Sequence, residues 1–476
     1  MSLTEFFDTT LLVLLTGLVA LRLWMWNKNR VRSADGPSAK KNEVGLQSLH
    51  YRYLAVFWIL RAADWMQGPY FYEVYASKRD ETGEPFSQMT IAILFLCGFI
   101  SSGICGTFVG VVVDKFGRKK GCLALCVIYS LSALTTTSNS LTVLVLGRFM
   151  GGVATSLLES APESWFVCQH NVHKIDGSLL GKCFGWAWFG NSIVAIIAGY
   201  LASTVATVGS SGEQDPTAPF MASVALLVIG FVMIAFLWGE NYGSTGSTGG
   251  GGSANAKALS TSEQISSTLR TIRSTPSIAL VGAIQSLFEG SMYVFVLAWA
   301  PCIKAFATGD EEVPFGKIFS CFMVCCMVGS SLFGELMGAY GGKVEKFIPL
   351  VLVAAAGAMS MSAILSSSFL VVVAGFFVFE ATVGMYFPSI NCLRSAYVPN
   401  EIRSTAMNIF RVPLNVIVVT LNLSVNVIGT NGSLFATGFI LVAAFFAATS
   451  LKKMYVTYLR SFVFYARFHM HSLNFY

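Results

Sequence analysis

Long apolar blocks separated by short polar loops run through almost the whole chain. A bilayer core about 30 Å thick requires roughly 20 apolar residues for each helical crossing. Several blocks reach that length, and a helix satisfies its own backbone hydrogen bonds inside lipid. The pattern therefore predicts an all-α membrane protein.

The first predicted span covers about 7–26. Glu5 and Asp8 precede or begin it and basic residues follow it, which favours an uncleaved helix with its amino terminus outside the cell. Two of the later spans, at 141–168 and 369–395, contain proline and charged residues. The twelve later spans are predicted at 51–76, 88–113, 121–138, 141–168, 181–205, 217–238, 276–303, 313–337, 347–365, 369–395, 403–428 and 431–451.

A polar segment divides these spans into two sets of six. Residues 243–253 read GSTGSTGGGGS, a flexible composition that packs no core. A short surface helix is expected after it, at 263–273. The predicted regions are an extra amino-terminal helix with its cytoplasmic linker at 1–50, a six-helix bundle at 51–238, a cytoplasmic Gly/Ser-rich linker at 239–275, a second six-helix bundle at 276–451 and a cytoplasmic tail at 452–476.

Composition and loop charge agree with this topology. The chain is 54% hydrophobic and 12% charged, whereas a soluble domain carries about 25% charged residues. The net charge of +6 reflects basic loops, among them 115–120 and the segment holding Arg394 and Arg403, that alternate with acidic ones. Lysine and arginine are retained on the cytoplasmic side, so the linker and the carboxyl tail are expected there. We expect a plasma-membrane protein within a lipid bilayer, and no nucleic-acid partner.

Small residues recur at matching places in the two halves. Such symmetry is expected of transporters, which hold their substrate between repeats near the midplane. Small residues four apart also occur where helices simply pack, so both interpretations remain open. The matching residues are Ser101, Ser102, Gly106 and Gly110 in the second span after the leading helix, and Ser330, Ser331, Gly334 and Gly338 in the eighth.

The loop at 110–120 carries the most specific motif, GVVVDKFGRKK. It resembles the signature loop of the major facilitator superfamily, which implies two six-helix bundles around a central site. Gly110 permits close helix approach, and Asp114 can pair with a basic group across the interface. The residues expected to act in gating are Asp114, Lys115, Gly117, Arg118, Lys119 and Arg148, with Arg148 nearer the cytoplasmic end of its span.

Further segments resemble the molybdate-anion transporter branch of that superfamily. That resemblance implies secondary active transport of molybdate, a tetrahedral oxyanion, across a cell membrane. The segments are ADWMQGPYFY at 63–72, ESW at 163–165, WGENYG at 238–243, QSLFE at 285–289, YFPS at 386–389 and FRVPL at 410–414.

Polar residues inside predicted spans are costly and usually functional. Arg411 is the first candidate for the anion because its planar guanidinium suits oxyanions, although pairing with a carboxylate also fits. Arg61 and Asp64 share a helix face, which fits either a structural ion pair or a pair facing the cavity. The expected substrate-binding residues are Arg411, Arg61, Asp64, Gln67, Tyr70 and Asn415.

A dianion entering a negative-inside cell is opposed by about 4.6 kcal/mol per 100 mV, twice the value for one charge. Coupling to protons or other cations is therefore expected, and in the case of protons a buried carboxylate would be the carrier. The candidates are Glu163, Glu289 and Glu380, for which structural pairing with an arginine is the alternative.

Other functions compete with oxyanion transport. Another small solute, such as sulfate or a sugar, fits the same fold, and so does a membrane sensor that does not transport. The sequence has no phosphate-binding glycine loop, nucleophile elbow or His-Glu-x-x-His motif, so we expect no enzyme, no cofactor and no metal.

Overall fold

A computed structural model describes residues 2–33, 43–80, 83–173, 175, 177–207, 215–243, 260–307 and 313–473. Nearly all of these residues are helical, and ten helices among them are long and apolar enough to cross a membrane. The predicted all-α membrane fold is therefore confirmed. Residues 244–259, the middle of the predicted Gly/Ser-rich linker, lie outside the described residues.

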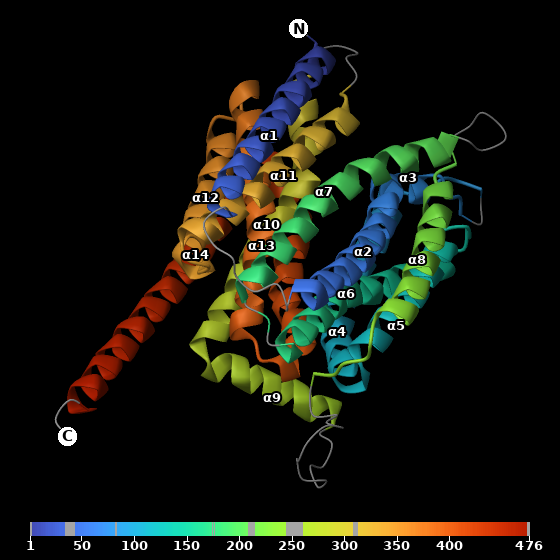
Figure 1. Cartoon of the computed structure of the whole chain (residues 1–476). Helices are drawn as coiled ribbons and strands as arrows, with labels where there is room; N and C mark the ends of the chain where they lie inside the picture. Colours follow the sequence, from blue (N-terminus) through green and yellow to red (C-terminus); the bar gives the residue numbers. More distant parts are fainter. Residues whose placement is uncertain are drawn as a thin grey trace.

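The first half of the chain forms one bundle after the leading helix (Figure 1). Its core is built from apolar side chains of several helices, among them Tyr53, Leu125, Phe166 and Phe184. The helices are α1 (Leu3–Ser33), α2 (Glu43–Gln67), α3 (Phe71–Ala76), α4 (Gln88–Phe116), α5 (Arg118–Thr135), α6 (Leu141–Val172), α7 (Gly177–Thr207) and α8 (Ala218–Leu237).

The second half forms the other bundle, around a core that includes Phe288, Phe322, Phe376 and Phe379. A surface helix, α9, precedes it and begins with a capping box of Ser260 and Glu263, which confirms the short helix expected there. The helices are α9 (Thr261–Ser274), α10 (Pro276–Lys304), α11 (Phe315–Ala339), α12 (Ile348–Ile364), α13 (Phe369–Tyr397) and α14 (Arg403–Leu473).

Two breaks fall where the sequence contains proline or glycine. The span predicted at 51–76 is not one helix: α2 stops at Gln67, and a 3-10 turn at Gly68–Tyr70 leads into α3. Pro69 causes this because it lacks a backbone N–H. In α14, Gly429 adopts φ 68° and ψ 175°, which divides the helix where two separate spans were predicted.

The two spans that contain internal proline are continuous helices. α6 runs through Pro162 and α13 through Pro388. Three predicted spans correspond to helices that are shorter or more polar than the ten apolar ones, namely α2 with α3, α5 and α12. They complete the two sets of six because each packs inside its bundle.

The two halves come together at the end of the molecule that carries Gly117, α9 and the start of α14, and they diverge toward the other end (Figure 1). We call this the linker end. α1 does not join the first bundle: Leu3 and Phe7 are buried in the core of the second.

Candidate functional site

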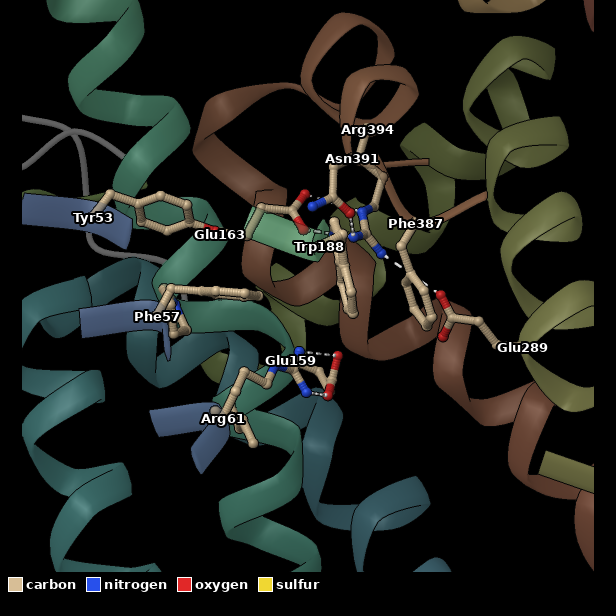
Figure 2. A pocket seen from close by; sticks show the side chains of 12 residues that line it. Tyr53, Phe57, Arg61, Glu159, Glu163, Trp188, Glu289, Phe387, Asn391 and Arg394 are labelled. Carbon is tan, nitrogen blue, oxygen red and sulfur yellow. Dashed lines mark hydrogen bonds and ion pairs between the residues drawn. The ribbon is translucent and has the colours of Figure 1, made fainter. Parts of the chain in front are cut away.

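A small cavity of about 20 Å³ lies between the two halves, lined mainly by α2, α6 and the last third of α13. That volume admits about one water molecule, so the charged groups that line it lie close together. Figure 2 shows these charged groups facing one another from both halves. They include Arg61, Glu159, Glu163, Glu289 and Arg394.

Arg61 on α2 pairs mainly with Glu159 on α6. Its two terminal nitrogens lie 2.6 and 3.1 Å from the two carboxylate oxygens, a bidentate arrangement. Asp64 is more distant, at 3.9 Å, and accepts a hydrogen bond of 2.6 Å from Tyr129. Arg61 therefore interacts with Glu159 as well as with Asp64, the partner expected from the sequence. Glu159 was not among the candidates, although it lies one turn before Glu163.

Arg394 connects the two halves. Its Nε donates to Glu163 at 3.0 Å and its Nη2 at 2.5 Å, while Asn391 accepts at 2.6 Å (Figure 2). Glu289 on α10 lies 4.0 Å from the same guanidinium and accepts a hydrogen bond from Tyr386 at 3.2 Å. The assignment of Arg394 to a basic loop is wrong, because α13 continues to Tyr397 and buries it.

Arg411 and Asn415 lie one turn apart on α14, and both are more than nine-tenths buried. The Arg411 guanidinium interacts with Tyr293 and with the charges of Glu159 and Glu289. Within the described part of the chain, Arg411 Nε and both polar atoms of the Asn415 amide have no hydrogen-bond partner. Leaving such groups unpaired is costly, so this face of α14 is able to hold a polar ligand.

These charges form one alternating chain across the middle of the molecule. Arg61 and Arg394 each lie within 4.0 Å of two carboxylates, and the charge of Arg411 interacts with those of Glu159 and Glu289. At least one carboxylate of each pair belongs to the first half of the sequence. Three arginines balance three of four carboxylates, which leaves one negative charge. In order, the members are Asp64, Arg61, Glu159, Arg411, Glu289, Arg394 and Glu163, and we call them the central chain.

Three other predicted site residues lie elsewhere. Gln67 donates to Ser223 on α8 at 2.9 Å, which ties α2 to its own bundle, and Tyr70 packs in an apolar cluster with Val74 and Phe220. Glu380 lies between α11 and α13, where Cys326 Sγ donates to it at 2.9 Å. None of the three lines the central cavity.

Asp114 lies at the linker end, where the two halves meet. It accepts hydrogen bonds from the backbone N–H groups of Ser404 (3.3 Å) and Thr405 (2.9 Å), which begin α14. A carboxylate is favourable at a helix N-terminus. Arg118 is fully buried beside it, 3.0 Å from Asp114, and donates to the Asn400 side chain at 3.0 Å. The signature loop thus contacts the opposite half directly.

The rest of this loop is held by Glu240, which sequence analysis did not single out. Its carboxylate accepts from the backbone N–H of Lys119 at 2.8 Å and of Lys120 at 3.2 Å, at the start of α5. Gly117 adopts φ 121°, which a side chain would strain. Lys119 Nζ donates to the Ala235 carbonyl, while Lys115 lies over the Phe116 ring. Both of these contacts lie within the first half.

The position expected for Arg148 is wrong. It lies over the Phe71 ring at 4.5 Å and donates to the Leu94 carbonyl, near the start of α4. α6 begins at Leu141, directly after the far end of α5, so its first turns lie away from the linker end. Arg148 is therefore at the end opposite Asp114.

The glycines of the second and eighth spans occupy unlike surroundings. A Cβ on Gly110 would lie 2.7 Å from the Ser404 carbonyl oxygen and 2.8 Å from Thr405 Cα. A Cβ on Gly338, the matching position, would meet nothing within 4 Å. Close approach of α4 and α14 therefore depends on Gly110, and the repeat does not extend to this contact.

We expect Gly110→Ala to lower the unfolding temperature and to slow turnover at least tenfold, because backbone atoms of α14 must move. Gly338→Ala is the matched control. Alanine in an open helical position gains roughly 0.5–1 kcal/mol over glycine, so this variant should be as stable as the parent or more so. Thermal unfolding in detergent measures the stability of the two variants, and equal effects at the two positions would contradict the close contact.

The chain has relatives in sequence and in structure. Residues 11–384 match the family described as sugar transporters with 12 transmembrane helices. A molybdate-anion transporter of Xenopus laevis is 30% identical over 80% of this chain and 80% of its own length. One of Takifugu rubripes is 30% identical over 77% of this chain and 76% of its own.

Solved structures share the fold. The fucose:proton symporter of E. coli has a TM-score of 0.62 at 13% identity and covers 86% of this chain and 98% of its own. A human organic anion transporter gives 0.60 at 12% identity, covering 84% and 99%. A bacterial homologue of the iron transporter ferroportin, in an outward-facing state, gives 0.63 at 13% identity, covering 86% and 99%.

Proposed function

We propose a cargo and a mechanism for this chain, which belongs to the major facilitator superfamily of membrane transporters, in the branch of the molybdate-anion transporters. The proposed cargo is a small oxyanion, molybdate, carried through the middle of the molecule by alternating access. The observation that carries the proposal is the face of α14 on which Arg411 and Asn415 are buried with unpaired polar atoms.

The chemistry of this face suits a tetrahedral oxyanion. A guanidinium offers parallel N–H donors in a fixed fork, and the Asn415 amide adds a neutral donor one turn away. An oxyanion at Arg411 would compete with Glu159 and Glu289 for the same charge. A neutral sugar would not need an arginine inside an alternating chain of ions, which favours the oxyanion over the sugar alternative.

Alternating access requires contacts between the halves that break and re-form. Three sets have that character: Arg394 with Glu163 in the central chain and, at the linker end, Asp114 with the start of α14 and Arg118 with Asn400. We propose that these contacts form the inner gate. Loop charge supports placing the linker end in the cytoplasm of a plasma-membrane protein.

The charge of the central chain supports proton coupling. The chain already carries one negative charge, and a dianion would bring the total to three in a site that is only partly exposed to water. Protonation of a carboxylate relieves this. Glu289 is our first candidate, because its distance to Arg394 is 4.0 Å and an oxyanion at Arg411 would weaken its second partner.

Equilibrium binding tests the cargo. Purified protein in detergent should bind radiolabelled molybdate saturably, and unlabelled tungstate should displace it because the ions have the same shape and charge. Sulfate, which is smaller, measures selectivity. Fucose and xylose serve as controls and should displace nothing. Displacement by a sugar, or an absence of saturable binding to protein that remains folded, would contradict the proposal.

A further inference from the structure

The extra helix α1 lies alongside α11 of the second half, and both run in the same direction (Figure 1). Near its start, Lys317 Nζ lies 2.7 Å from Asp8, and near its end Lys28 pairs with Glu335. The pairs are separated by 20 residues on α1 and 18 on α11, roughly 30 Å at 1.5 Å per residue. Two ion pairs so far apart fix both the register and the direction of α1 on α11.

Apolar contacts reinforce this attachment to the second half. Phe7 is fully buried and packs edge-on against Phe369 of α13. Leu18 is buried against Val324 and Met327 of α11. α1 therefore moves as part of the second half, although it precedes the first half in the sequence.

α1 also reaches the first half through one polar side chain. The Arg22 guanidinium lies 4.6 Å from the Trp186 ring and 4.6 Å from the Phe189 ring, both on α7. Phe189 and Ile196 of α7 also pack beside Leu18. α1 thus covers the seam between α7 and α11, where Gly181 and Gly185 of α7 face Phe333.

We propose that α1 is a strap across this seam and that Arg22 is the positioning residue that favours the observed conformation. The reason is geometric. Because α1 is held to α11 at both ends, a movement of α7 relative to α11 cannot carry α1 with it, and the contact of Arg22 with Trp186 and Phe189 must break. The strap therefore sets the ratio of the two conformations that alternating access requires. The proposal rests on alternating access, and on no other part of the proposed function.

The outward face of α1 offers a matched control. Leu23 is adjacent to Arg22 in sequence but 60% exposed, on the side that faces lipid. Leu23→Ala removes a side chain from the same helix turn without touching α7. Arg22→Lys keeps the charge but loses the planar group that stacks on the rings, so it should produce a smaller effect than Arg22→Ala.

Distances across the linker end test the proposal. Spin labels are attached at the exposed positions Lys120 and Lys343 through an unnatural amino acid, because native cysteines remain in the protein. The distance distribution is recorded in lipid without any substrate. Arg22→Ala should increase the population of the longer distance about three- to tenfold relative to the shorter one, on the order expected for loss of a partly exposed cation–π contact. Leu23→Ala should leave the ratio unchanged.

A second variant, Trp186→Leu, removes one of the two ring contacts of Arg22 from the other helix. It should shift the ratio in the same direction, by less, which covers the case in which Arg22→Ala does not fold. An unchanged ratio in these variants, with two distances present in the wild type, overturns the strap. A wild type with only one distance under all conditions overturns alternating access instead. Neither result depends on the identity of the cargo.

Discussion

Replacement of Arg411 by alanine is expected to abolish saturable molybdate uptake, with a loss of at least a hundredfold, while the protein remains folded in the membrane. Arg411 is 4% exposed on α14, and its charge interacts with those of Glu159 and Glu289. Truncating a buried charged partner costs about 2–5 kcal/mol, and 2.7 kcal/mol already corresponds to about a hundredfold in affinity.

The control for Arg411 is another arginine inside a span. Arg148 contacts only its own half, through Phe71 and the Leu94 carbonyl, so Arg148→Ala should keep uptake within several-fold of the wild type. Arg411→Lys preserves the charge but not the planar fork and should retain only part of the activity. Molybdate uptake per molecule of protein in proteoliposomes measures all three. Unchanged uptake in Arg411→Ala would remove this residue from the site.

Loss of Arg394 is expected to have the second largest effect, and a larger one than loss of its partner Glu163. In Arg394→Gln, Glu163 and Glu289 are both left without the cation between them, and an uncompensated buried charge costs about 3–5 kcal/mol. In Glu163→Gln, Arg394 keeps Glu289 at 4.0 Å and Asn391 at 2.6 Å.

Thermal unfolding in detergent and the linker-end distance distribution measure this difference. Arg394→Gln should lower the unfolding temperature more than Glu163→Gln, and it should also shift the distances further toward separated halves. Asn391→Ala removes a neighbour of Arg394 without altering any charge, and it serves as the control for loss of one hydrogen bond. If Glu163→Gln is as damaging as Arg394→Gln, then Glu289 does not share Arg394 as the geometry indicates.

The apolar blocks predicted most of the fold because lipid imposes a simple rule: each crossing must be a helix of about 20 apolar residues. The same rule explains the errors. It does not distinguish a buried charge near the end of a helix from a charge in the following loop. Arg394 was therefore counted with a basic loop, although it falls inside the span predicted at 369–395 and α13 runs to Tyr397. The rule also does not predict the break at Pro69, because the break comes from the missing backbone N–H of proline and not from apolar length.

Part of the central site could be predicted from residue type alone. Five ionisable groups inside spans were singled out, and the structure brings all five into the central chain: Arg61, Asp64, Glu163, Glu289 and Arg411. Their partners could not be predicted, because the pairing of Arg61 with Glu159 joins positions 98 residues apart. Periodicity offered one usable signal: Glu159 and Glu163 share a face of α6.

The position of α1 had no counterpart in the sequence pattern. An extra helix that precedes the first half is expected to pack there, because neighbours in sequence are usually neighbours in space. Instead, α1 packs on the second half, where Asp8 forms an ion pair with Lys317, 309 residues away in the sequence. Surface ion pairs contribute little individually, so the burial of Phe7 in the second core contributes more to this docking.

Uptake of radiolabelled molybdate by proteoliposomes, under imposed pH and voltage gradients, tests the central claim most directly. The account predicts saturable accumulation that depends on the protein, increases when the outside is acidic relative to the inside, and is lost in Arg411→Ala. Uptake no faster than in protein-free vesicles under every imposed gradient, from protein that is folded and correctly inserted, would contradict it.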